Sequence, residues 1–125
     1  MTRVFSAIAI AVTAAATSVA ASCADDPRLV GPCFTVHGRL YTANGTPSLR
    51  VWPVGTRRLL GIGPGDDREM IVPPTLLTLF ERRPERRVYG DFEVCPFTAD
   101  RAGRMRIVCI ESYSTTFIED DPPEP

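Results

Sequence analysis

The sequence contains no lysine, and its formal net charge is −1. A nucleic-acid-binding protein usually carries a surplus of basic residues, because contacts to phosphates supply most of its affinity. The charge balance therefore argues against nucleic acid as a partner. All 14 basic residues are arginines. This bias reflects either a GC-rich bacterial genome or planar, bidentate recognition of carboxylate and phosphate groups.

Motifs of several enzyme classes are also missing. The sequence has no Gly-x-Ser-x-Gly motif for a serine nucleophile, and His37 is its only histidine. No Cys-x-x-Cys spacing supports zinc or thioredoxin-type redox chemistry. We therefore expect no bound metal, no cofactor and no catalytic residue.

The amino-terminal end is typical of a secretory signal. Arg3 precedes an apolar run over 4–16, and small residues follow as far as Ser22. A membrane-spanning helix needs about 20 apolar residues, so this run is too short. Without residues 1–21 roughly 100 residues remain, which is enough for one compact domain. The sequence thus predicts an exported protein, either periplasmic or secreted.

The remaining chain divides into three parts. Residues 22–32 are polar and contain two prolines, which is typical of a leader segment. A single β-rich domain is expected over 33–118. Residues 119–125 contain only acidic residues and prolines, which predicts a disordered tail.

The four cysteines predict a disulfide framework, because an even number in a short exported chain is typical of one. If the last hairpin is centred on Ala102, Cys95 lies directly opposite Cys109. This register predicts one bridge between Cys95 and Cys109 and the other between Cys23 and Cys33.

Lipidation of Cys23 is the alternative. The stretch 20–23 reads Ala-Ala-Ser-Cys, which loosely matches a lipoprotein signal. A lipid on Cys23 would anchor the protein to a membrane and would leave Cys33 without a partner. Membrane association is expected only in this case.

Alternation of apolar and polar residues predicts strands over 34–41 and 49–54, with a third over 57–62. Pro73-Pro74 and Pro84 bracket a short helix, since proline is tolerated in the first turn of a helix but not in its interior. Two more strands are expected over 88–95 and 104–113, with an extension over 115–118. The predicted fold is mainly β with one short helix, an OB-like five-stranded barrel of order β-β-β-α-β-β. A small curled antiparallel sheet with a covering helix is the alternative.

One surface of the first two strands combines arginine with aromatic side chains. If the register places Arg39 near Trp52 and Tyr41 near Arg50, these side chains share one outer surface. The candidate ligand-binding residues are His37, Arg39, Tyr41, Arg50 and Trp52. Such surfaces stack sugars or bases and pair with anionic groups. The alternative interpretation is that Trp52 is part of the core and that the arginines only solvate the sheet.

Two further features give alternative functions. The hairpin centred on Ala102 would place Glu93 opposite Glu111, with Asp91 on the same face, and paired carboxylates can hydrolyse glycosidic bonds. The basic bend over 82–87 could dock an acidic protein, as in an inhibitor of a secreted enzyme.

Four stretches resemble a group of small exported bacterial proteins of unassigned function. They are Val36–Leu40 (VHGRL), Asn44–Pro47 (NGTP), Gly55–Gly61 (GTRRLLG) and Val88–Phe97 (VYGDFEVCPF). The resemblance implies export and a single domain, and it brings no catalytic residue. The strand surface, together with the lack of a nucleophile motif and of a metal cluster, favours a non-enzymatic binding module for an anionic envelope glycan or another ligand. The alternative is a protein-interaction or inhibitor domain of the envelope.

Overall fold

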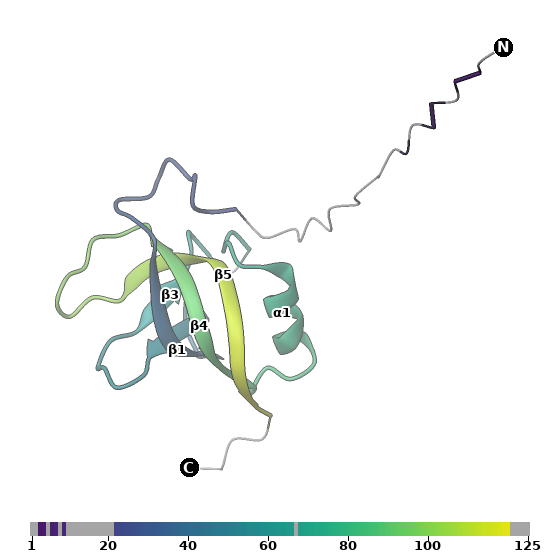
Figure 1. The fold of residues 1–125 in the computed structure, drawn as a ribbon. Helices are drawn as coiled ribbons and strands as arrows, with labels where there is room; N and C mark the ends of the chain where they lie inside the picture. Colours follow the sequence, from purple (N-terminus) through teal and green to yellow (C-terminus); the bar gives the residue numbers. More distant parts are fainter. Residues whose placement is uncertain (1–2, 5, 8, 10–21, 67, 121–125) are drawn as a thin grey trace.

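The computed structural model describes residues 3–4, 6–7, 9, 22–66 and 68–120, and it contains five strands and one short helix. The elements are β1 (Phe34–Thr42), β2 (Leu49–Pro53), β3 (Leu60–Ile62), α1 (Pro74–Glu81), β4 (Arg87–Pro96) and β5 (Arg106–Glu119). The strands form one closed sheet in the order β1-β2-β3-β5-β4 (Figure 1). Only β3 and β5 are parallel. The predicted mainly β fold, with one helix between its third and fourth strands, is confirmed.

The bounds of β1, β2 and β4 differ from the prediction by one residue at one or both ends, and those of β3 and β5 differ more. β3 begins at Leu60 rather than at Arg57, because Thr56 forms a turn: its hydroxyl donates to the Pro53 carbonyl at 2.8 Å and accepts from the Arg58 N–H at 3.1 Å. β5 continues to Glu119, where the tail was predicted to begin. Residues 121–125, and most of the predicted signal over 1–21, lie outside the described residues.

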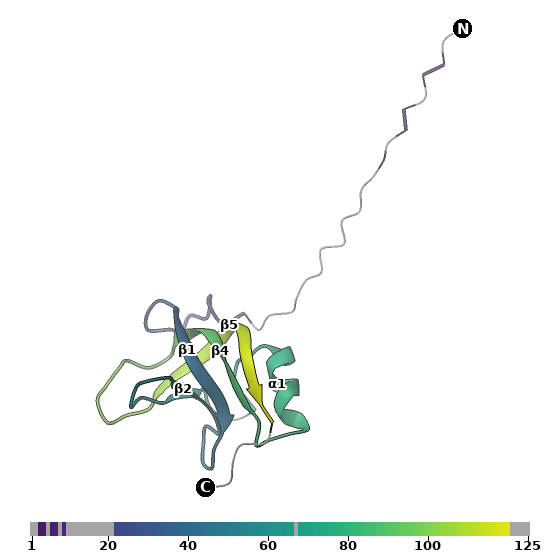
Figure 2. The ribbon, with the colours of Figure 1, turned by 60° about the horizontal axis from the view of Figure 1, so that its bottom comes forward.

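Helix α1 begins at Pro74, in agreement with the tolerance of proline in a first turn. It turns Leu76 and Phe80 into the core. The helix has eight residues, and no helix in the described parts of the chain is long and apolar enough to cross a membrane. Figure 2 shows α1 packed against one side of the sheet, away from the loop between β4 and β5.

The core lies between the inner face of the sheet and α1. Alternate residues of each strand point inward, as the period of a strand requires. The buried hydrophobic members of this cluster are Leu40, Leu49, Val51, Leu60, Ile62, Val72, Leu76, Phe80, Val88, Phe92, Val94, Val108 and Ile110.

The sheet closes where β1 and β4 bring two glycines face to face. Gly38 lies opposite Gly90, and both are buried. A Cβ atom on Gly38 would lie 2.7 Å from Val51 Cγ1, and one on Gly90 would lie 2.1 Å from the Ser114 carbonyl oxygen. The neighbouring strands therefore approach more closely at this point than any side chain would allow.

Two disulfides fasten the segment before β1 to the β4–β5 hairpin. They join Cys23 to Cys109 and Cys33 to Cys95, with Cα–Cα distances of 6.4 and 4.1 Å. The predicted pairing is therefore wrong, although Cys95 does lie opposite Cys109. Both cysteines are completely buried beneath the incoming segment, and each bonds to a cysteine from that segment.

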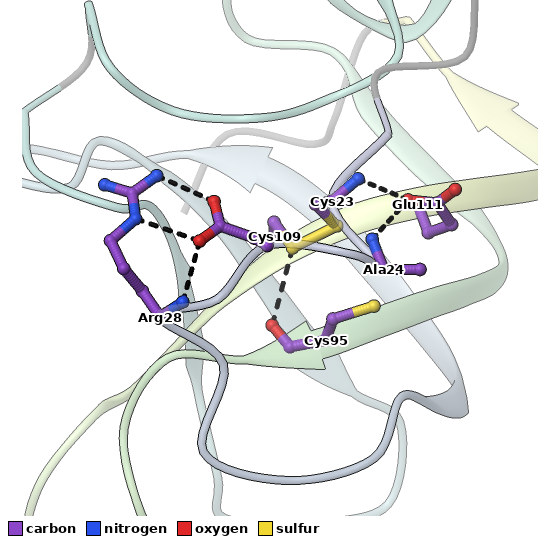
Figure 3. A network of polar contacts seen from close by, with 7 residues as sticks. Cys23, Ala24, Arg28, Cys95, Cys109 and Glu111 are labelled. Carbon is purple, nitrogen blue, oxygen red and sulfur yellow. Dashed lines mark hydrogen bonds and ion pairs between the residues drawn. A yellow bond between two sulfur atoms is a disulfide. The ribbon is translucent and has the colours of Figure 1, made fainter.

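Figure 3 shows the polar contacts around the Cys23–Cys109 bridge. The Cys109 sulfur lies 3.6 Å from the Cys95 carbonyl oxygen, a contact without a proton because the sulfur is bonded to Cys23. The Arg28 side chain donates to Asp26 at 2.7 and 3.0 Å, and the Arg28 backbone N–H donates to the same carboxylate. These hydrogen bonds lower the pKa of Asp26 to about 2. The segment over 22–32 is thus held by covalent and polar contacts.

The pairing also bears on the lipid alternative. The sulfur of Cys23 is bonded to Cys109 and so cannot carry a lipid thioether. All four cysteines are paired, which is compatible with an exported, oxidising compartment.

Peptide mapping tests the disulfide pairing. Trypsin cleaves after arginine and separates the four cysteines, because cuts after Arg28, Arg87 and Arg106 fall between them. Without reduction, we expect the peptide ending at Arg28 to remain linked to the one starting at Ile107. The remaining two cysteine peptides are expected to be linked to each other. A Cys95–Cys109 link in the mass spectrum would contradict the structure.

The contact of Gly90 with β5 predicts a large difference between two glycine substitutions. Gly90→Ala is expected to lower the free energy of unfolding by about 1–3 kcal/mol, because the Ser114 carbonyl belongs to a paired strand and cannot move freely. Gly31→Ala is the control, since its Cβ would meet Pro96 at an ordinary 3.6 Å. Urea unfolding measures both values, and equal stabilities would refute the packing argument.

Candidate functional site

The outer surface of β1 and β2 has the predicted register. Arg39 lies opposite Trp52, and Tyr41 lies opposite Arg50. On β4, Tyr89 is the other neighbour of Arg39, and on β5 Phe117 lies opposite Tyr89. We call this set the aromatic face. It comprises Arg39, Tyr41, Trp52, Tyr89 and Phe117.

Arg39 lies at the centre of the aromatic face. Its guanidinium carbon is 4.8 Å from the centroid of the Trp52 ring and 5.1 Å from that of Tyr41. Its Nε is buried and has no hydrogen-bond partner. Attraction between the cation and the two ring faces therefore holds the side chain in place.

Tyr89 and Phe117 extend the face across two more strands. Their ring centroids are 5.8 Å apart and the rings are tilted by 46°. Phe117 is 58% exposed, so much of its ring surface is open to a ligand. Sequence analysis missed both residues, because their positions depend on the long-range β1–β4 pairing and on bulges in the β4–β5 ladder.

Trp52 is half-buried, and its indole N–H donates to the Thr56 carbonyl at 2.8 Å. This bond fixes the ring at the edge of the face next to the β2–β3 loop. Arg50 has a different role from the one expected. Its Nε donates to the Pro47 carbonyl and its Nη2 to the Asn44 carbonyl, both at 3.1 Å. Its guanidinium therefore braces the β1–β2 loop and is less available to a ligand.

His37 lies on the same side of β1, one pleat away from Arg39. Its Nδ1 is 3.1 Å from Oδ1 of Asp91, the residue opposite it on β4. Both side chains are more than half exposed, at 59% and 52%. The pair adds polar groups along one border of the aromatic face.

The predicted pair of carboxylates does not form across the hairpin. A bulge between Glu93 and Val94 places Ser112 opposite Glu93 and leaves Glu111 without a partner on β4. Glu111 instead accepts hydrogen bonds from the backbone N–H groups of Cys23 at 2.6 Å and Ala24 at 3.0 Å (Figure 3). Its carboxylate thus holds the segment that the Cys23 disulfide fastens.

The basic bend after α1 is partly neutralised by the end of β5. Arg86 forms an ion pair with Asp120 at 2.5 Å and donates to the Leu79 carbonyl at 3.0 Å. Arg87 lies 3.5 Å from Glu119. These arginines therefore join two parts of the fold, which weakens the case for the bend as a docking surface.

In the described ranges, one group of three or more closely spaced His, Cys, Asp or Glu side chains is found. The single cluster is Cys23, Cys95 and Cys109, whose sulfurs are all used in disulfides. No family model, no curated protein and no solved structure matches the chain. Functional inference therefore has to start from the geometry of the site.

A double-mutant cycle tests the contact between Arg39 and Trp52. Arg39→Met keeps the aliphatic length but removes the cation, and Trp52→Leu removes the ring. We expect a coupling of about 0.5–1 kcal/mol in the free energy of unfolding. The control pairs Trp52→Leu with Arg68→Met, a change at an exposed residue elsewhere. A coupling energy for the Arg39–Trp52 cycle no larger than that of the control cycle would show that the contact between the guanidinium and the indole ring adds nothing to stability.

Proposed function

We propose that the protein is an exported, non-enzymatic binding module that holds a glycan on the aromatic face. The observation that carries the proposal is the line of Trp52, Arg39, Tyr89 and Phe117 across four neighbouring strands. Strands lie about 4.8 Å apart, so the line extends over roughly 14 Å. This length suits an extended ligand of several rings.

The chemistry of the face also supports a glycan. Sugar rings present flat C–H surfaces that pack on aromatic rings, and they carry hydroxyl groups at their edges. Phe117 and Tyr89 offer ring surface, while Asp91 and His37 offer hydrogen-bonding groups along the border. Arg39 adds a positive charge at the centre, which favours a glycan with carboxylate or other anionic substituents.

Three independent features support an exported location for the protein. The residues over 1–21 have the layout of a secretory signal, and the four cysteines are all paired. The resemblance of Val88–Phe97 and the other three stretches to small exported bacterial proteins points the same way. A periplasmic or secreted protein would meet envelope glycans directly.

An envelope protein is the second candidate partner, and Phe117 is the observation that favours it. Exposed aromatic residues next to an arginine are typical of the energetic centre of a protein interface. Such a partner would use the same face, so mutations on the face would weaken its binding as well. The two candidates differ in whether isolated oligosaccharides bind at all.

Fluorescence tests the proposal directly, because Trp52 is the only tryptophan. Titration with anionic glycans and peptidoglycan fragments is expected to change the Trp52 emission in a saturable way. Phe117→Ala is expected to weaken binding at least about fivefold, a typical effect of truncating an aromatic residue that contacts the ligand.

Val30→Ala is the matched control, because Val30 is also 58% exposed but lies in the segment before β1. It should leave the affinity unchanged. A glycan series that never alters the emission, or a Phe117→Ala variant that binds as tightly as the wild type, would overturn the glycan proposal. Co-purification of a protein from native envelope extract, lost in Phe117→Ala, would favour the second candidate.

A further inference from the structure

We infer that a cleft between the β2–β3 and β4–β5 loops binds an oxyanion: a phosphate, a sulfate or a carboxylate. The cleft has a volume of about 290 Å³ and is separate from the aromatic face. Its lining residues are Arg57, Arg58, Leu59, Gly103, Arg104 and Met105. The inference does not depend on the proposed glycan function.

The topology of the sheet brings the two loops together. β3 and β5 are the parallel pair, with Leu60 opposite Arg106. Residues 57–59 come directly before β3, and residues 103–105 come directly before β5. Because the two strands are parallel neighbours, both segments lie at the same end of this strand pair. In Figures 1 and 2 the β4–β5 loop extends on the side of the molecule away from α1.

The charge at this end is strongly one-sided. Residues 54–59 and 97–106 contain five arginines and one acidic residue, Asp100. Asp100 forms an ion pair with Arg58. In the parts of the chain that the structure describes, no carboxylate pairs with Arg57 or Arg104, and both side chains are exposed. Two guanidinium groups are therefore available to an anion.

The walls of the cleft are fixed in place by contacts within the loops. The Thr56 hydroxyl accepts a hydrogen bond from the Arg58 N–H, and the ion pair between Arg58 and Asp100 links one loop to the other. The β4–β5 loop is held at its base, where Thr98 accepts from the Ile107 N–H at 2.9 Å and from Arg106 at 3.1 Å. An anion would thus enter a site whose loops, and whose Arg58, are already held in place.

The chemistry of the lining selects for oxyanions. A guanidinium group presents paired N–H donors that match two oxygens of a phosphate, sulfate or carboxylate. Leu59 and Met105 supply apolar surface between the arginines, which reduces screening by water and strengthens the attraction. The volume suits a small anion or one charged sugar unit rather than a large ligand.

Nuclear magnetic resonance on the full mature protein tests the inference. Inorganic phosphate is added at constant ionic strength, and the backbone amide signals are followed. We expect saturable shifts centred on Leu59, Gly103 and Arg104. The double variant Arg57→Gln, Arg104→Gln is expected to bind phosphate at least about tenfold more weakly, because both free guanidinium groups are lost.

The matched control removes two positive charges elsewhere, with Arg68→Gln and Arg82→Gln, which are also exposed. It should retain the wild-type affinity. Equal weakening in both double variants, or shifts that never saturate and spread over the whole surface, would overturn the inference. Urea unfolding of each variant confirms that the fold is intact.

A second arm identifies the source of the anion. A sulfated or carboxylated oligosaccharide is compared with its neutral counterpart and with inorganic phosphate. Tighter binding of the charged oligosaccharide, lost in the cleft variant, supports the cleft as a subsite for a glycan substituent. Equal affinity for phosphate and the charged oligosaccharide supports a site for a free anion. Phe117→Ala should not affect phosphate binding. The proposal for the cleft and the proposal for the aromatic face can therefore be refuted independently of each other.

Discussion

The absence of side chains at Gly38 and Gly90, which lie opposite each other in the β1–β4 ladder, is the constraint on which the rest of the structure depends. Only glycine fits at either position, because a Cβ would meet a neighbouring strand at 2.7 or 2.1 Å. The β1–β4 pairing closes the sheet and places β1 between β2 and β4, and the glycines let β2 and β5 pack tightly against this pair. Arg39, the residue after Gly38, then has Trp52 on one side and Tyr89 on the other. The aromatic face is therefore a consequence of the closure.

The two disulfides attach the segment before β1 to the β4–β5 hairpin. A bridge between directly opposed cysteines would only have reinforced a β4–β5 pairing that the ladder already supplies. The observed bridges instead tie Cys23 and Cys33 to that hairpin, across 86 and 62 residues. Longer closed loops restrict the unfolded chain more, so this pairing stabilises the fold more than two local bridges would. The Glu111 carboxylate adds hydrogen bonds at the same place.

Local sequence patterns predicted the parts of this fold that depend on short-range physics. The alternation of the pleat placed Arg39 and Tyr41 on one face of β1, the structure has the register that was assumed for β2, and Pro74 marked the start of α1. Long-range features did not follow from such patterns. Bulges in β4–β5 moved Glu111 out of the predicted carboxylate pair and brought Phe117 opposite Tyr89. A bulge depends on how a strand bends over the whole core, which no local alternation encodes.

The disulfide pairing failed for a related reason. The opposed positions of Cys95 and Cys109 were predicted correctly, but proximity across a ladder does not decide which sulfur each one meets. That choice depends on the path of residues 22–32, which have no periodic pattern to predict it. Arg50 shows the same limit for the site, because its bonds to the β1–β2 loop depend on the loop's backbone path.

The aromatic face and the oxyanion cleft meet at a single turn. The Thr56 carbonyl accepts from the Trp52 indole, and the Thr56 hydroxyl accepts from the Arg58 N–H. Consider a ligand whose rings lie on the aromatic face and whose charged substituent reaches the cleft. Once one part of it is bound, the other part is held near its own site, and this raises the overall affinity. On this argument, a charged oligosaccharide would bind more tightly than the separate affinities of its rings and its anionic group suggest.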